Sequence, residues 1–168
     1  MSGSRRDLAS TLTDGCRERL GLERAALFDR LMDEDSGDPR RLLSVLRDDQ
    51  EFGRALVWCD TADRLAPLFS ESPGEWSSEN ERSGPLGDES FGVAWIFRTV
   101  HDLAGVFNGL PATGREVTVR GFTIIAFDAE SGKVKVRRYV DWAAVFAQLG
   151  LTLNWRVPVP ADAGQAGS

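Results

Sequence analysis

Residues 116–141 read EVTVRGFTIIAFDAESGKVKVRRYVD, and this stretch decides the fold. Its first part, 116–127, is rich in Val, Ile, Thr and Phe, and its last part, 133–141, alternates between apolar and polar residues. Both patterns are typical of β-strands. The turn Glu130-Ser131-Gly132-Lys133 joins the two strands and predicts that they run antiparallel.

A third strand is predicted immediately upstream, over residues 93–103. Alternation there sets six residues on one face, namely Val93, Trp95, Phe97, Thr99, His101 and Leu103. Downstream, residues 143–149 predict a short helix that Gly150 ends.

The first half of the chain predicts helices. Residues 22–32 nearly follow helical spacing, and Asp38-Pro39 is typical of an N-cap followed by proline at the first helical position. The apolar run 55–59 has the length of a strand, residues 61–69 suggest further helical turns, and residues 70–90 suggest a long loop. Helices first and antiparallel strands afterwards predict an α+β fold, with the helices packed on one side of a curved sheet.

Length and charge restrict the class of protein. A chain of 168 residues is long enough for one compact domain, which we expect over 21–155, between a flexible arm at 1–20 and a flexible tail at 156–168. The net charge of −6 argues against nucleic acid as the main partner. No apolar stretch has the length of a membrane span and no secretory signal is recognisable, so we expect a cytoplasmic protein.

The sequence offers few residues for metal binding. Cys16 and Cys59 are the only cysteines, and two thiols make no disulfide framework and match no zinc spacing. With His101 as the single histidine, a His-rich metal site is excluded, and we predict no metal site, although a site made of carboxylates alone stays formally possible.

Three pieces of the second half resemble one known family. They are GVFNGLPATG at 105–114, the strand REVTVRG at 115–121, and the run from Gly132-Lys133-Val134 through Tyr139-Val140-Asp141 to Gln148-Leu149-Gly150. In this order and spacing they resemble the SnoaL-like polyketide cyclases of the nuclear-transport-factor-2-like superfamily. The resemblance covers about a third of the chain, from residue 93 to residue 150.

The resemblance implies a fold and an activity. The fold would be a cone-shaped, strongly curved antiparallel sheet around an apolar cavity, closed by helices, and family members often pair through their sheets, which implies a homodimer. The activity would be a cofactor-free, intramolecular aldol-type ring closure on a small polyketide-like substrate in bacterial secondary metabolism. This reaction uses an aspartate on the last long strand.

Asp141 occupies the position of that aspartate. A free aspartate is a weak base, with a pKa of about 3.9, and burial beside Trp142 would raise this pKa towards the range in which a general base works. The alternative is that Asp141 only caps the helix that follows it.

His101 is the second catalytic candidate, as proton donor or second base. The family's histidine position falls on Leu103, but residues two apart in a strand share a face, so His101 could enter the same cavity. The alternative is a hydrogen-bonded histidine in a partly buried strand. Further substrate-binding candidates are Trp95 and Phe97 on the face of His101, Leu103, Trp142, and Arg137 and Tyr139, which share strand parity with Asp141.

Two other classes of function remain open. A dehydratase or isomerase would use the same proton transfers, whereas an epoxide-opening enzyme of this fold is disfavoured because Arg98, Arg120 and Arg138 lack an aspartate two residues on. The other class is a non-catalytic protein that binds a small molecule or a partner.

Overall fold

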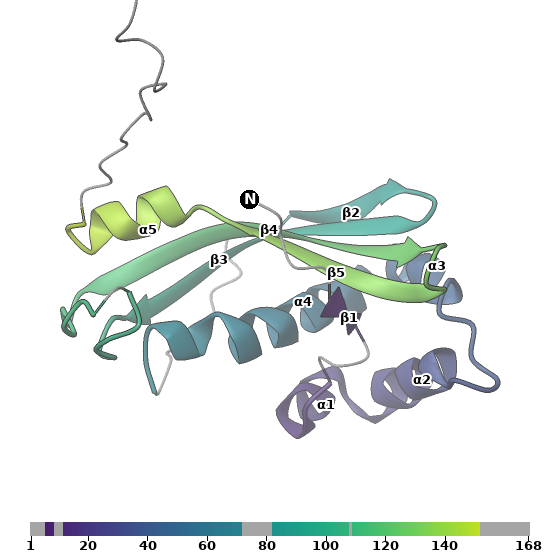
Figure 1. The fold of residues 1–168 in the computed structure, drawn as a ribbon. Helices are drawn as coiled ribbons and strands as arrows, with labels where there is room; N and C mark the ends of the chain where they lie inside the picture. Colours follow the sequence, from purple (N-terminus) through teal and green to yellow (C-terminus); the bar gives the residue numbers. More distant parts are fainter. Residues whose placement is uncertain (1–5, 9–11, 72–81, 108, 152–168) are drawn as a thin grey trace, which may run out of the picture.

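The computed structural model describes residues 6–8, 12–71, 82–107 and 109–151. The chain forms an α+β fold in which helices come first and most of the sheet afterwards, as predicted (Figure 1). In chain order the elements are β1 (Arg6–Asp7), α1 (Asp14–Leu20), α2 (Leu22–Met32), α3 (Arg41–Asp48), α4 (Gln50–Arg64), the 3-10 turn η2 (Ala66–Leu68), β2 (Arg82–Gly87), β3 (Ser90–Val100), β4 (Glu116–Asp128), β5 (Lys133–Val140) and α5 (Trp142–Gln148).

The sheet is antiparallel throughout and has the strand order β1-β5-β4-β3-β2. The long strand β4 lies at its centre and pairs with β3 along its whole length, with Trp95 opposite Gly121. β5 pairs with β4 only from Gly121 to Asp128, so residues 116–120 of β4 have no partner in β5. The sheet is open, with β1 and β2 as its two edges.

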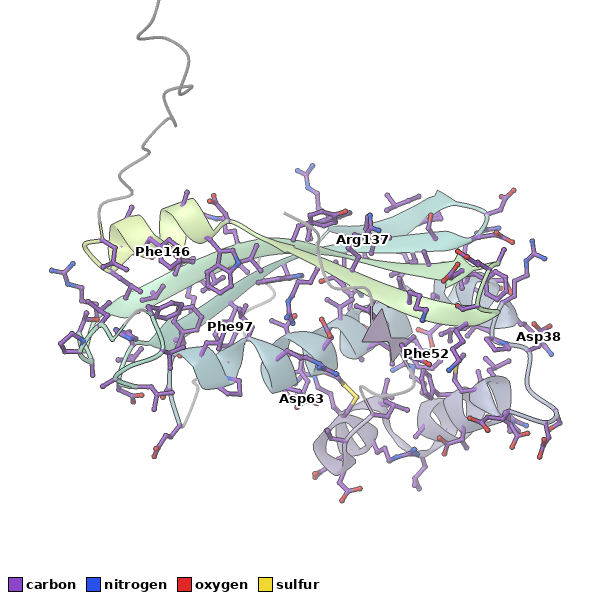
Figure 2. The ribbon with its side chains drawn as sticks, viewed as in Figure 1. Asp38, Phe52, Asp63, Phe97, Arg137 and Phe146 are labelled. Carbon is purple, nitrogen blue, oxygen red and sulfur yellow. A yellow bond between two sulfur atoms is a disulfide. The ribbon has the colours of Figure 1, made fainter. Side chains whose placement is uncertain are left out.

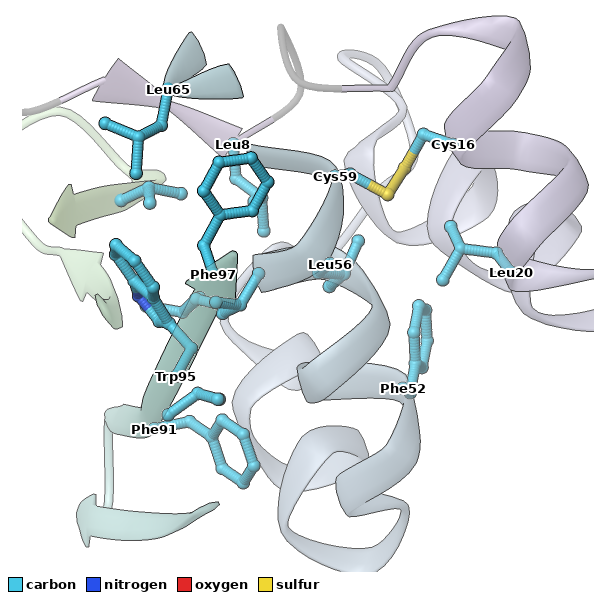
Figure 3. Close-up of a cluster of buried hydrophobic side chains, with 14 of the residues drawn as sticks. Leu8, Cys16, Leu20, Phe52, Leu56, Cys59, Leu65, Phe91, Trp95 and Phe97 are labelled. Atoms are coloured by element: carbon cyan, nitrogen blue, oxygen red, sulfur yellow. A yellow bond between two sulfur atoms is a disulfide. The ribbon is translucent and has the colours of Figure 1, made fainter. Parts of the chain in front are cut away.

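Alternation along the strands gives the sheet two different faces. The inner face packs against α4 and carries Phe91, Val93, Trp95 and Phe97 of β3, none of which is more than 2 % exposed. Figure 3 shows Phe91, Trp95 and Phe97 on one side of α4 and Phe52 on the other side, next to Leu20. All of them belong to one apolar core. The opposite face, which we call the open face, bears Leu86 and Tyr139, with exposed fractions of 54 % and 44 %.

Gly121 is required by the packing of this core. A Cβ atom at this position would lie 2.2 Å from Cζ2 of Trp95 and 2.5 Å from the carbonyl oxygen of Tyr139. The missing side chain therefore lets the Trp95 indole lie flat against the centre of β4.

Two of the predicted elements are wrong. Residues 55–59 belong to α4 and not to a strand, because α4 lies between the sheet and helices α1 and α3 and is buried on several sides, which makes a continuous apolar run. Residues 82–87 of the predicted loop form the edge strand β2, whose mostly exposed residues show no apolar alternation. Residues 72–81 of that loop, and the expected tail at 156–168, lie outside the described residues.

Of the arm expected over residues 1–20, the structure describes residues 6–8 and 12–20, and these are packed against the core. Leu8 is fully buried, and Leu20 of α1 is 4 % exposed. Cys16 of α1 forms a disulfide with Cys59 of α4, with the two Cα atoms 5.4 Å apart (Figures 2 and 3). The sequence did not predict this single crosslink. This bond ties α1 to the helix that supports the sheet.

Candidate functional site

His101 follows the last residue of β3 and is fully buried. Its backbone N–H donates to the carbonyl of Arg115 at 2.9 Å, and its own carbonyl accepts from Gly114 at 2.8 Å. These bonds close the loop 102–113 at its base. They also bring Thr113, of the Pro-x-Thr-Gly turn, against the imidazole ring.

Thr113 fixes the tautomer of His101. The backbone N–H of Thr113 donates to Nδ1 at 3.2 Å, and the Thr113 hydroxyl oxygen lies 3.0 Å from the same nitrogen. A nitrogen that accepts a backbone N–H carries no hydrogen itself, so the hydrogen of the neutral ring is assigned to Nε2. Within the described part of the chain, the buried Nε2 has no hydrogen-bond partner.

One aromatic ring lies against this imidazole, and further rings extend from it in a cluster. The Phe107 ring lies 5.8 Å from the His101 ring, and Trp142 stacks on Phe69 with 6.5 Å between centroids and an interplanar angle of 14°. We call this cluster the aromatic end of the molecule; it comprises His101, Phe69, Phe97, Phe107, Trp142 and Phe146. Figure 2 labels Phe97 on the sheet and Phe146 on α5 at this end.

The aromatic end is built from parts that are distant in sequence. Phe69 and Phe97 are buried, whereas Phe107, Trp142 and Phe146 are half-buried, so solvent reaches one side of the cluster. The carbonyl of Phe69 accepts the backbone N–H groups of Asp102 and Leu103, which fastens the end of the η2 turn to the loop after β3. The result is an apolar wall beside the buried imidazole of His101.

Asp141 lies outside this wall. It is exposed, and its Oδ1 accepts the backbone N–H of Ala144 at 3.1 Å. The capping alternative is therefore confirmed, and the expectation that Asp141 lies inside a closed apolar cavity is wrong. The reason is geometric, because Asp141 continues the strand parity of Arg137 and Tyr139, which point to the open face.

The remaining predicted residues divide between the two faces. Phe97 and Trp142 join His101 at the aromatic end, and half-buried Leu103 follows β3 in the loop beside Phe69. Trp95 lies deeper in the core, where its Nε1 donates to the Thr123 hydroxyl at 2.9 Å. Arg137 and Tyr139 lie on the open face, where Nη1 of Arg137 donates to the Tyr139 hydroxyl at 3.3 Å.

The sequence analysis did not predict the buried ion pair between Asp60 and Arg138. Asp60 of α4 is 3 % exposed, and its Oδ2 accepts from Nη1 of Arg138 at 3.1 Å, with Nε of Arg64 3.9 Å from Oδ1. The parity of Arg138 with Val134 and Val136 was the available signal, because it assigns an arginine to the buried face of β5. Since the carboxylate is matched by two guanidinium groups, the pair fastens α4 to the sheet.

Two other classes of feature, a metal site and a membrane-spanning helix, bear on the function. Residues 6–8, 12–71, 82–107 and 109–151 contain no group of three His, Cys, Asp or Glu side chains placed to hold a metal ion. None of the helices among these residues is both long and apolar enough to cross a bilayer. Comparisons with family models, with curated proteins and with solved structures found no match to this chain.

Proposed function

We propose that the chain is a cofactor-free enzyme of the polyketide cyclase type, which binds a small carbonyl compound at the aromatic end. One observation carries the proposal, the buried Nε2 of His101 beside an apolar wall. The resemblance to the SnoaL-like cyclases gives the reaction class, and in this proposal the curved sheet and the helices enclose the aromatic end as the family's apolar cavity.

His101 acts as the hydrogen-bond donor to the substrate. An unsatisfied buried donor costs about 1–3 kcal/mol, and a carbonyl oxygen at Nε2 would remove this cost. Because the Thr113 backbone N–H donates to Nδ1, the hydrogen of the ring is on Nε2, where it is available to the substrate. A neutral donor of this kind stabilises the negative charge that forms on the oxygen when a proton leaves the neighbouring carbon.

Ring closure also needs a base at that carbon. The resemblance gives this role to Asp141, which could serve only a substrate that extends from the aromatic end past Trp142 to the exposed start of α5. The Asp141 carboxylate is exposed and already accepts the backbone N–H of Ala144. The polarisation of the carbonyl by His101 must therefore supply more of the rate. A dehydratase or isomerase would use the two residues in the same way.

A second candidate function is non-catalytic binding of the same class of compound. The capping bond and the exposure of Asp141 favour it, because binding needs only the apolar wall and the donor on His101. The epoxide-opening alternative has no specific observation in its favour.

The first test measures binding of a bicyclic ketone, 1-tetralone, and of tetralin, the hydrocarbon of the same shape without the oxygen. His101→Phe keeps an aromatic ring and removes the donor. We expect this variant to bind tetralone about tenfold more weakly, the worth of one buried hydrogen bond, and to bind tetralin as the wild type does. Tyr139→Phe, on the open face, is the control and leaves both affinities unchanged.

Equal tetralone affinity in the wild type and His101→Phe would overturn the proposal. Turnover separates the two candidate functions. An enzyme closes a linear 2,4,6-triketone faster than buffer does and loses this rate in Asp141→Asn while still binding tetralone. A binding protein leaves the triketone unchanged in both forms.

The homodimer and the cytoplasmic location stay predictions. Sedimentation analysis tests the first, and the thiol state of Cys16 and Cys59 in cell extracts bears on the second. A disulfide is typical of oxidising compartments and rare in the cytosol, where thiols are kept reduced.

A further inference from the structure

The open face carries a second candidate site, on the side of the sheet away from α4. Figure 2 labels Arg137 on this face. A shallow groove with a volume of about 220 Å³ lies here, near the turn between β4 and β5. Its lining includes Ile124, Ala126, Asp128, Ala129, Lys135 and Arg137.

The groove has an apolar floor and a basic rim. Ile124 pairs across the sheet with Arg137, and Ala126 pairs with Lys135, so each apolar side chain lies beside one cation. Because the Ala126 side chain is small, it leaves open space between the apolar residues of β4 and the cations of β5. All four residues are half-buried, which makes the site accessible from solvent.

The two cations of the rim have no acidic partner within the described part of the chain. Asp7 stands opposite Lys135 in the β1–β5 pair, but its carboxylate is turned to the neighbouring Lys133, whose Nζ lies 3.1 Å from Oδ2 of Asp7. Arg137 makes one hydrogen bond, to the neutral Tyr139 hydroxyl, which orients its guanidinium group without neutralising it.

The one carboxylate in the lining is already engaged. Asp128 accepts from the Glu130 backbone N–H at 3.2 Å and from the Ser131 hydroxyl at 2.9 Å. These bonds hold it in the turn, where it shapes the end of the groove. The two cations of the rim outnumber this one carboxylate, which leaves the lining with a net positive charge.

From this arrangement we propose that the groove binds a small monoanion with an apolar body, such as an aromatic carboxylate. The carboxylate would accept from Lys135 and Arg137, and the apolar body would cover Ile124 and Ala126. Charge-assisted hydrogen bonds from an arginine to a carboxylate are among the strongest polar contacts in proteins. The site does not depend on His101 or on the function proposed above.

The charges on the protein favour this ligand over two other possible occupants of the groove, a second copy of the chain and a nucleic acid. The open face also carries Arg82 and Arg120, so a second copy of the chain on the same face would bring like charges together. This charge counts against the pairing through the sheets that the resemblance implies. Nucleic acid would meet the long-range repulsion of a chain with net charge −6. A single carboxylate with an apolar body matches both the local charge and the floor.

The test is an NMR titration of the ¹⁵N-labelled full chain with 2-naphthoate and with 2-naphthamide, which has nearly the same shape and no charge. We expect naphthoate to shift the amide signals of residues 124–126 and 135–137. The double variant Lys135→Gln/Arg137→Gln should weaken naphthoate binding about tenfold, as expected for the loss of charge-assisted hydrogen bonds. It should leave the weak naphthamide binding unchanged.

Two matched variants serve as controls. Arg120→Gln removes a cation of the same face outside the groove and should change naphthoate affinity less than about twofold, the effect of one distant surface charge. His101→Phe should have no effect. The proposal is overturned by equal naphthoate affinity in the wild type and the double variant, by naphthamide binding as tightly as naphthoate, by shifts confined to the aromatic end, or by a dimer that covers the face and abolishes the shifts.

Discussion

Asp49 performs two tasks with one carboxylate. It is the N-cap of α4, where Oδ1 accepts the backbone N–H of Phe52 at 3.3 Å, and it accepts from Nε and Nη2 of Arg24, both at 2.9 Å. The hydrogen bonds from the Arg24 guanidinium, more than the capping bond, lower the pKa of Asp49 below its ordinary value, against the opposing effect of partial burial. One residue thus fixes the start of α4 and ties it to α2.

This pKa shift predicts a pH dependence of stability. A carboxyl whose pKa is lowered by folding stabilises the native state above its unfolded pKa, near 3.9, and this contribution is lost as the pH falls through the lower folded value. Asp49→Asn keeps a capping side chain and removes the charge. We expect wild type to exceed Asp49→Asn in urea midpoint near neutral pH, and the difference to shrink below about pH 4.

Asp49→Ala serves as the control, because it removes the cap as well and stays less stable than Asp49→Asn across the whole range. A constant difference between wild type and Asp49→Asn from neutral pH to pH 3 would contradict the assignment.

At the scale of elements, α5 completes the sheet where β5 ends. The Gln148 side chain accepts the backbone N–H of Thr118 and donates to the Thr118 carbonyl, both at 2.8 Å. A side-chain amide therefore takes the place of the missing strand neighbour on β4. The arrangement satisfies an otherwise unpaired backbone and holds Trp142 and Phe146 at the aromatic end.

Removal of this amide should loosen α5. We expect Gln148→Ala to lower the free energy of unfolding by about 1–3 kcal/mol, because two partly buried backbone groups lose their partner. Hydrogen exchange at the Thr118 amide should become faster. Gln148→Glu keeps an acceptor for the Thr118 N–H and should protect that amide better than Ala does; unchanged exchange in Gln148→Ala would disprove the role of the side chain.

Prediction from sequence succeeded where one face of an element is buried and the other is not. β3, β4 and β5 have this property, and so do α2, α3 and α5, whose existence was predicted. It failed for α4, which is buried on several sides, and for β2, which is exposed along most of its length. Apolar periodicity is absent in both cases, for opposite reasons.

Prediction of the candidate site also depended on periodic patterns in strands and helices. The shared face of Phe97 and His101 followed from strand alternation, and the capping role of Asp141 was one of two readings of its position. Parity correctly grouped Arg137 and Tyr139 with Asp141, but it does not tell which face the helices cover. Thr113, Phe69 and Phe107 lie outside the regular strands and helices, where no periodic pattern predicts their contacts.

At the scale of the whole molecule, the disulfide joins the N-terminal helix to the rest of the core across 43 residues of sequence. A crosslink of this span stabilises the native state by about 4 kcal/mol when only the entropy of the unfolded chain is counted. Stabilities of natural domains are about 5–15 kcal/mol, so this bond would supply a large part of the total.

Reduction should therefore lower the urea midpoint of the wild type strongly. The double variant Cys16→Ala/Cys59→Ala should unfold at a low midpoint with or without reductant, which separates the bond from other effects of the reagent. Unchanged stability after mass spectrometry has confirmed two free thiols would show that the crosslink contributes little.

The depth of this crosslink also sets how it can be broken. Cys16 and Cys59 are at most 1 % exposed, so a thiol reagent in water cannot touch either sulfur while α1 lies against α4. Cleavage therefore requires that α1 first separates from α4. The rate of cleavage in excess reagent then measures how often the amino-terminal helix detaches from an otherwise native molecule.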